Sequence, residues 1–212
     1  MNLVQIPTDT WVAASWQDYL QAIEHPDFEK AKSYYHDRRF RIEATTIGHD
    51  HAADHTIANT IVALFCTLKT IPAKGLNNCT FRKSGVREAQ PDLAYYLNEN
   101  AEVVPWGTSL IDLDRYPAPD LVIEIANTSL SDDQGEKRLL YEDLQVKEYW
   151  IFDVKHVRVL AFAIENQGSR RITESIVLPK LSIALLQQAL QRTRQENQSQ
   201  VGAWLLSEFN RL

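Results

Sequence analysis

The chain has 212 residues, of which 44% are hydrophobic and 24% are charged, and its formal net charge is −6 at pH 7. This composition is ordinary for a globular protein with its own core, and it predicts one domain over residues 1–212. The acidic charge argues against a general, basic nucleic-acid binder, and the lack of a signal peptide or of an apolar run near 18 residues predicts a cytoplasmic protein without a membrane partner.

The N-terminal third of the sequence predicts a helix, a hairpin and a second helix. Ser15 suits the N-cap of a helix over residues 15–24. A polar turn at Asp37 and Arg38, followed by a strand in which polar and apolar residues alternate, predicts a β-hairpin over residues 33–46. Apolar residues at helical spacing predict a long helix over residues 51–71.

The middle of the chain alternates strand patterns with turn residues. Strands are expected over residues 79–85, 90–97 and 120–127, the last one densely apolar and typical of a buried strand. Ser131 and Gln134 have the spacing of a capping box, which predicts the start of the next helix.

The C-terminal part predicts three more strands and two helices. The strand patterns cover residues 148–154, 157–164 and 174–179, and the first two are expected to pair across a short turn. Helices are expected over residues 183–195 and 201–210. The whole order of elements predicts the α/β class, with a central mixed β-sheet flanked by helices.

Four ionisable residues stand out by their positions in this pattern. Glu43 ends a strand, Asp92 opens a strand, Glu124 lies inside a nearly apolar strand, and Lys137 lies on the apolar stripe of a helix. Carboxylates on rigid strands are suitable ligands for a hard divalent cation, and a nearby lysine can stabilise developing negative charge. The pattern therefore indicates the chemistry of a phosphodiester-cleaving site.

These residues also carry a resemblance to a known family. The segments QPD, PDLVIEIAN and GEKRLLYEDLQVKEYWIFD resemble the Uma-type endonucleases of the restriction-endonuclease-like PD-(D/E)xK superfamily. The resemblance covers residues 30–180, which would form the core, with residues 181–212 as a helical C-terminal extension. It implies a restriction-endonuclease-like fold, a Mg²⁺ or Mn²⁺ site, a DNA substrate and a homodimer joined through the C-terminal helices.

The resemblance also implies roles for individual residues. Asp92 matches the aspartate of the PD element, and Glu124 matches the acidic member of (D/E)xK, so these two would bind the metal. Ala126 stands where the superfamily usually has its lysine. Lys137 resembles a lysine that has migrated to the following helix, and Glu43 matches an acidic residue of the N-terminal element.

Simpler interpretations of these charged residues remain open. Glu124 and Lys137 could form a buried salt bridge without catalytic purpose. Asp120 precedes Glu124 by four residues on the same strand face, about 13 Å away at strand rise. That separation is too large for two direct ligands of one ion, so Asp120 is expected to cap the strand start or to support the site indirectly.

Three histidines form a further cluster. His51 and His55 have the spacing of two metal ligands on one helix face, but the glutamate of a metalloprotease motif is missing between them. With His49, they are expected to be solvated residues at a helix N-terminus. A hydrolase that uses this cluster is the weakest of the functional hypotheses.

Two stronger hypotheses remain for the function. The first is a magnesium-dependent endodeoxyribonuclease that uses Glu43, Asp92, Glu124 and Lys137. The second is a catalytically silent member of the same fold that binds nucleic acid or another protein.

Overall fold

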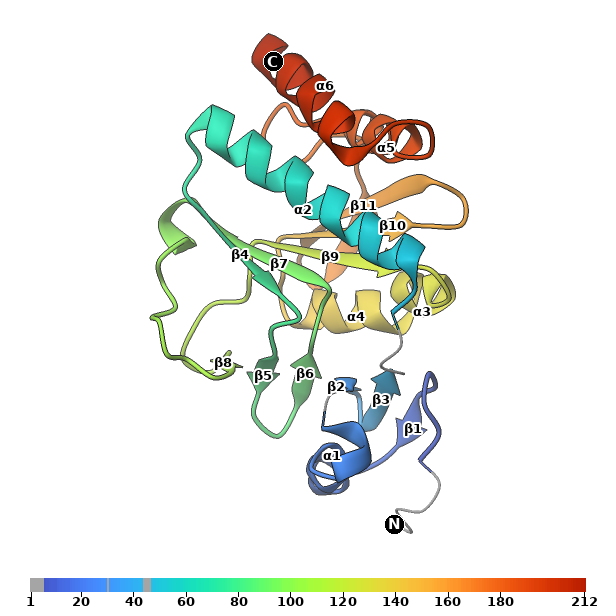
Figure 1. Cartoon of the computed structure of the whole chain (residues 1–212). Helices are drawn as coiled ribbons and strands as arrows, with labels where there is room; N and C mark the ends of the chain where they lie inside the picture. Colours follow the sequence, from blue (N-terminus) through green and yellow to red (C-terminus); the bar gives the residue numbers. More distant parts are fainter. Residues whose placement is uncertain (1–5, 30, 44–46) are drawn as a thin grey trace.

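The computed structural model describes residues 6–29, 31–43 and 47–212, and this part of the chain forms two six-stranded mixed sheets with helices around them (Figure 1). The α-helices are α1 (Trp16–Ile23), α2 (His49–Lys69), α3 (Leu130–Gln134), α4 (Glu136–Asp143), α5 (Ile183–Arg192) and α6 (Gln198–Arg211). The strands are β1 (Val12–Ala13), β2 (Lys32–His36), β3 (Arg39–Glu43), β4 (Ala73–Asn77), β5 (Phe81–Lys83), β6 (Arg87–Ala89), β7 (Leu93–Leu97), β8 (Ile111–Asp112), β9 (Leu121–Ala126), β10 (Glu148–Asp153), β11 (Arg158–Glu165) and β12 (Gly168–Arg171).

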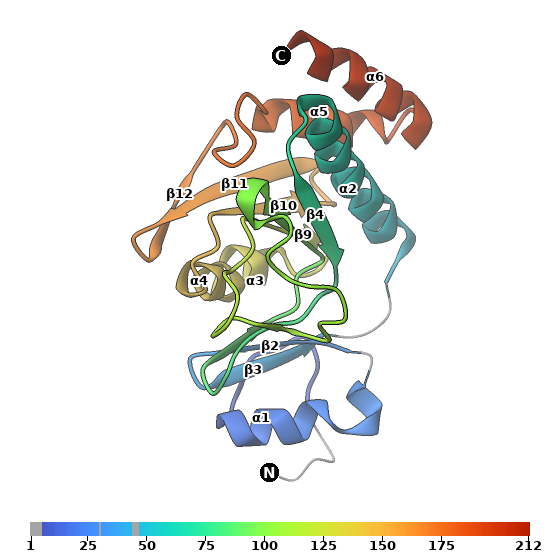
Figure 2. The same ribbon diagram turned by 90° about the vertical axis from the view of Figure 1, so that its left-hand side faces the viewer.

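The N-terminal sheet has the strand order β1-β3-β2-β6-β5-β8, and α1 packs against it (Figure 2). Ser15 caps α1 in a capping box with Asp18, as the sequence predicts for the N-cap. The expected hairpin is β2 and β3, which turn through Asp37 and Arg38 in the left-handed region. The end of the expected hairpin, residues 44–46, lies outside the described residues.

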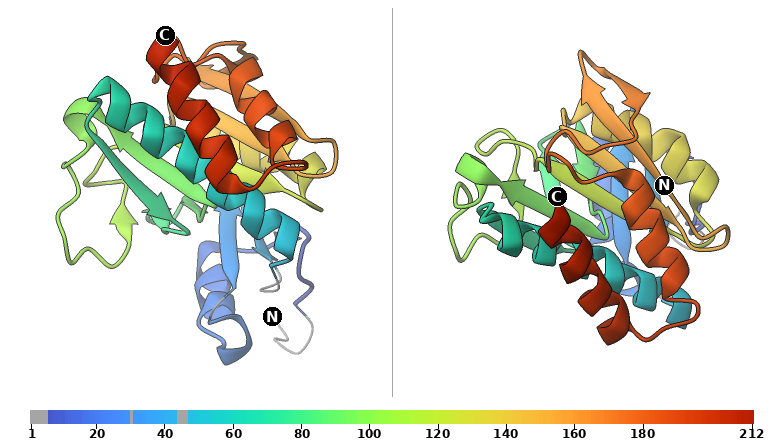
Figure 3. Two further views of the ribbon diagram at one scale, coloured as in Figure 1. Left: turned by 45° about the horizontal axis from the view of Figure 1, so that its top comes forward. Right: turned by 90° about the horizontal axis from the view of Figure 1, so that it is seen from above.

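The main sheet has the strand order β12-β11-β10-β9-β7-β4. Its central strands β9 and β10 are parallel, and the other neighbouring pairs are antiparallel. Helices α2, α5 and α6 lie over one face of this sheet, while α3 and α4 lie on the other face (Figures 1 and 3). The predicted α/β class is confirmed, although the sequence suggested one central sheet, and the short strands β1, β6 and β8 of the N-terminal sheet were not foreseen.

Strand β9 separates two hydrophobic cores because its side chains alternate. Leu121, Ile123 and Ile125 join the core beneath α2, α5 and α6, whereas Val122 and Ala126 join the core beside α4. The C-terminal helices belong to the first core, to which they contribute buried leucines and a phenylalanine. Glu124 points toward the second face, so the strand pattern itself places a carboxylate inside an apolar layer.

Two local predictions were wrong. Ser131 does not cap a helix, because α3 begins one residue after Ser129 and Ser131 already lies inside it. Residues 174–179 do not form a strand beyond a single bridge at Glu174. Their backbone N–H groups at 176 and 177 instead donate to the buried carboxylate of Glu148, which replaces a neighbouring strand as the acceptor.

Among the described residues, no helix has the length and apolarity needed to cross a membrane.

Candidate active site

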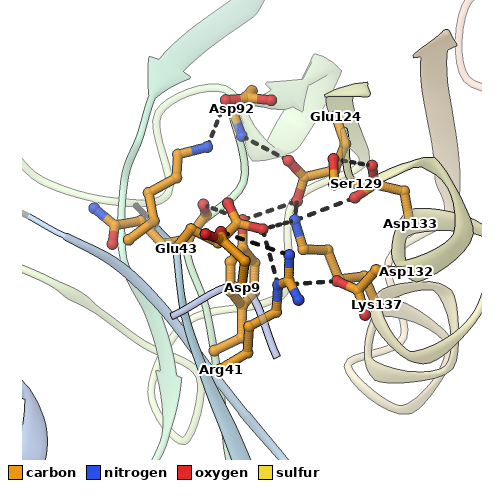
Figure 4. Close-up of polar contacts among 12 residues, drawn as sticks. Asp9, Arg41, Glu43, Asp92, Glu124, Ser129, Asp132, Asp133 and Lys137 are labelled. Atoms are coloured by element: carbon orange, nitrogen blue, oxygen red, sulfur yellow. Dashed lines mark hydrogen bonds and ion pairs between the residues drawn. The ribbon is translucent and has the colours of Figure 1, made fainter. Parts of the chain in front are cut away.

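The four residues selected from the sequence line one pocket. Glu43, Asp92, Glu124 and Lys137 surround a cavity of about 350 Å³. They reach it from the end of β3, the entrance of β7, the middle of β9 and the first turn of α4. The pocket therefore lies where the N-terminal sheet meets the main sheet, and Figure 4 shows the four side chains converging there.

Asp92 is buried, and its two carboxylate oxygens have different partners. Oδ2 accepts a hydrogen bond of 2.7 Å from the backbone N–H of Ile125 on β9. Oδ1 lies 2.5 Å from Lys32 Nζ and 3.4 Å from His51 Nε2. Burial by itself would raise the pKa of Asp92, but the Lys32 ammonium and the His51 ring hold it well below its usual range. Asp92 is therefore an anion.

Glu124 is held from both sides by hydrogen-bond donors. Its Oε1 accepts from the hydroxyls of Tyr141, at 2.6 Å, and Tyr34, at 3.2 Å. Its Oε2 accepts from the backbone N–H of Asp92, at 3.3 Å. Burial raises the pKa of Glu124 to about 8, and the nearby Lys137 ammonium offsets only part of that effect. A second cation beside Glu124 would favour its ionised form.

Lys137 is fully buried among three carboxylates. Its Nζ lies 2.6 Å from Glu43 Oε1, 3.1 Å from Asp133 Oδ1 and 3.8 Å from Glu124 Oε1 (Figure 4). Burial lowers the pKa of Lys137, but these carboxylates outweigh that effect and raise the pKa well above its usual value. The salt bridge considered from the sequence is thus one contact of a larger charge network, and Glu43 is the nearest partner.

The outer wall of the pocket holds Glu43 in place. Arg41 Nε lies 3.2 Å from Glu43 Oε1 and 3.2 Å from Asp132 Oδ2, so the arginine links β3 to α3. Burial would raise the pKa of Glu43, but the Lys137 and Lys32 ammonium groups lower it overall. Glu43 is therefore ionised, and its carboxylate lies between two cationic side chains.

Sequence reasoning missed several residues of the network, among them Lys32, Tyr34 and Asp133. Lys32 and Tyr34 lie two residues apart on β2, so both point to the same face and reach Asp92 and Glu124. The segment KSYYH has no alternation of polar and apolar residues that could have marked this face, and nothing in it shows which residues the face contacts. Asp133 lies in α3, four residues before Lys137, at the spacing of a helical ion pair.

Two of the histidines also contact this site, contrary to the expectation that they are solvated. His51 lines the pocket beside Asp92, and His55 Nε2 lies 3.1 Å from the backbone carbonyl of Asp92. His49 is exposed, and among the described residues it pairs with its neighbour Asp50. The helix N-terminus was predicted correctly, but packing of α2 against the β7 entrance buries one side of its first turn.

Asp120 lies outside the pocket. Its carboxylate accepts from the backbone N–H of Leu97 at 2.7 Å, and Lys147 Nζ lies 2.7 Å from it. These contacts agree with the predicted cap at the start of β9.

The carboxylates that could hold a metal ion are Asp92 and Glu124. In the described part of the chain, no three His, Cys, Asp or Glu side chains form a ready-made metal site. Mg²⁺, however, is commonly bound by one or two carboxylates together with water and substrate phosphates. A divalent cation in this pocket would favour the ionised form of Glu124, whose pKa burial raises to about 8. The ammonium groups and carboxyl groups that meet in the cluster are those of Lys32, Lys137, Glu43, Asp92, Glu124 and Asp133.

Comparison with known proteins shows the family of this chain and the fold it shares. The model of the Uma2 family, described as "Putative restriction endonuclease", matches residues 16–197. The chain belongs to this family. A crystal structure described as a putative nuclease belonging to DUF820, from Anabaena variabilis, aligns with a TM-score of 0.56 and 18% sequence identity. The alignment covers 83% of this chain and 98% of that chain.

The match to the Uma2 family confirms the resemblance seen in the sequence, and the structural neighbour confirms the fold. A search of curated proteins found no match. Membership of Uma2 supports a nuclease that acts on nucleic acid. The roles of the individual residues, the metal and the homodimer remain predictions.

Proposed function

We propose that this Uma2 protein is a metal-dependent DNA endonuclease that hydrolyses phosphodiester bonds. The observation that carries the proposal is the convergence of Asp92, Glu124 and the charged Lys137 in one pocket. Buried charges of this kind cost stability unless they are paired, and a carboxyl group in a pocket whose pKa is strongly raised by burial beside a charged partner is a candidate for a functional site.

Asp92 and Glu124 would hold the metal, which we expect to be Mg²⁺ or Mn²⁺. When bound, such an ion supplies a Lewis acid that polarises the phosphate and activates water. The backbone N–H of Ile125 fixes the orientation of Asp92, and the hydroxyls of Tyr34 and Tyr141 fix that of Glu124. These hydrogen bonds hold both carboxyl groups in fixed orientations toward the pocket.

Lys137 would act as a cation rather than as a general base. Its raised pKa keeps its three donor hydrogens in place, so it can orient the attacking water and stabilise the developing negative charge. Glu43 lies 2.6 Å from Lys137 Nζ and would keep the ammonium at the pocket wall. In the overall reaction, a water oxygen bonds to phosphorus, the bond from phosphorus to the leaving oxygen breaks, and that oxygen gains a proton.

Cleavage of supercoiled and linear DNA in the presence of Mg²⁺ or Mn²⁺ tests this function. We expect the wild type to cut DNA, and Asp92→Asn and Glu124→Gln to lose at least about a hundredfold in rate, because each loses a charged ligand. Lys137→Met should lose activity to a similar extent. Lys83→Met is the matched control, since Lys83 is half-exposed and lies outside the pocket.

One observation favours the silent alternative, a member of the fold that only binds. Lys32 already neutralises the pocket-facing oxygen of Asp92. If the wild type cuts no DNA form and neither cation raises its melting temperature, the silent alternative replaces the nuclease, because a ligand that binds only the native state must stabilise it.

A further inference from the structure

The contact between Lys32 and Asp92 has a specific geometry. The Oδ2 atom of Asp92 accepts the 2.7 Å hydrogen bond from the backbone N–H of Ile125 on β9. Only Oδ1 remains for the pocket, and Lys32 Nζ lies 2.5 Å from it. His51 Nε2 lies further away, at 3.4 Å. A metal bound by Asp92 would therefore use the oxygen that Lys32 contacts.

Strand β2 places Lys32 beside Asp92. It is the first residue of β2, opposite Glu43 of β3 in the antiparallel register, and its side chain is 17% exposed. The strand holds the stem of the side chain at the wall of the pocket, and part of the side chain is open to solvent. Lys137, by contrast, is enclosed by three carboxylates and has no such opening.

An ammonium and a divalent cation on the same oxygen would repel each other strongly. The ammonium neutralises Asp92 but offers no open coordination positions for water or phosphate, so it cannot replace the metal chemically. The two cations are therefore alternatives at this oxygen.

We propose that Lys32 is a tethered counter-ion of Asp92 that a divalent cation must displace, so that Lys32 sets the metal affinity of the pocket. This inference rests on the proposed metal-dependent function. It predicts a pocket that is stable without metal and that binds metal more weakly than its carboxylates alone would allow.

Calorimetric titration with Mn²⁺ tests the proposal without any measurement of activity. Lys32→Met keeps the apolar stem and removes the charge, so it should bind Mn²⁺ at least about tenfold more tightly than the wild type. Lys32→Arg keeps the charge and should bind no more tightly than the wild type. Asp92→Asn should bind at least about tenfold more weakly, and Lys83→Met should match the wild type.

The outcomes separate this inference from the function on which it rests. Equal or weaker binding by Lys32→Met, with binding lost in Asp92→Asn, would refute competition by Lys32 and leave the metal site intact. No binding by any variant, Lys32→Met included, would overturn both the metal site and the inference. Tighter binding by Lys32→Met and not by Lys32→Arg would support both.

A second measurement uses the wild-type protein, in case Lys32→Met does not fold. Lysine acetylation followed by mass spectrometry reports whether each ammonium is available to the reagent. We expect Lys32 to react slowly without added ion and several times faster with Mg²⁺, while Lys83 reacts equally in both. If Mg²⁺ raises the melting temperature but leaves Lys32 as protected as before, the ion binds without displacing the lysine, and the proposal is wrong.

Discussion

Replacing Lys137 by methionine removes the cation around which the candidate site is organised. Methionine keeps much of the apolar stem but leaves three carboxylates without their shared partner: Glu43, Glu124 and Asp133. Removing one member of a buried ion pair typically costs about 3–5 kcal/mol. Since a domain of this kind is stable by about 5–15 kcal/mol, the variant should still unfold in a measurable transition.

The loss of stability should depend on pH in a definite direction. Burial raises the folded-state pKa of Glu124 and Asp133 above their unfolded values, and without Lys137 those pKa values rise further. A carboxyl group whose folded pKa is raised stabilises the protein at low pH and loses that contribution as pH rises through the folded value. Over the pH range in which the folded variant keeps a proton that the unfolded chain has released, its free energy of unfolding should fall by about 1.4 kcal/mol per pH unit for each such proton. Up to about pH 8 the wild type also retains the Glu124 proton, so the deficit at lower pH comes from carboxyl groups that Lys137 keeps ionised in the wild type, such as Glu43. The deficit relative to the wild type should therefore be smaller near about pH 5 than near about pH 8, and Glu124 should add to it only at higher pH.

Urea denaturation followed by fluorescence of the five tryptophans measures this free energy of unfolding. Lys83→Met is the control, because Lys83 and its partner Asp114 are about half exposed and 3.9 Å apart. Its loss should stay below about 1 kcal/mol at either pH. A loss below about 1 kcal/mol for Lys137→Met at about pH 8, or the same loss at both pH values, would refute a network of buried charges.

Two further substitutions test how the fold holds the site. Gly135→Ala should destabilise the junction of α3 and α4, because the new Cβ would lie 2.9 Å from the backbone oxygen of Ser131. At Gly202 in α6 a new Cβ would meet open space, so Gly202→Ala should stabilise the protein by up to about 1 kcal/mol. Thermal melting should show opposite shifts for these two variants, and equal shifts would contradict the packing argument. Arg194→Met should cost about 2–3 kcal/mol, a drop of roughly 4–12 °C in Tm, because it leaves the buried Asp54 without its bidentate partner. An unchanged Tm would show that this ion pair does not fasten the C-terminal helices to α2.

The local pattern of the sequence was sufficient for the central strands and for the carboxylates on them. Alternation along β9 places Glu124 on the face opposite Leu121 and Ile123, and the structure has the same alternation. Prediction failed where a distant group satisfies the backbone. Residues 174–179 looked like a strand, but the buried carboxylate of Glu148 accepts their N–H groups instead. The short strands β1, β6 and β8 have too few residues for their period to be seen.

The sequence by itself determined the α/β class, the family and four of the charged residues that line the pocket. Their period and neighbours are local properties, and the family motif lies in consecutive segments. Only the tertiary structure decided that Lys32 meets Asp92, 60 residues away, and that Tyr34 meets Glu124, 90 residues away. Those contacts depend on how the N-terminal sheet sits against the main sheet. The position of one sheet against the other depends on the packing of many residues in both, so it cannot be predicted from the short segment of sequence around β2.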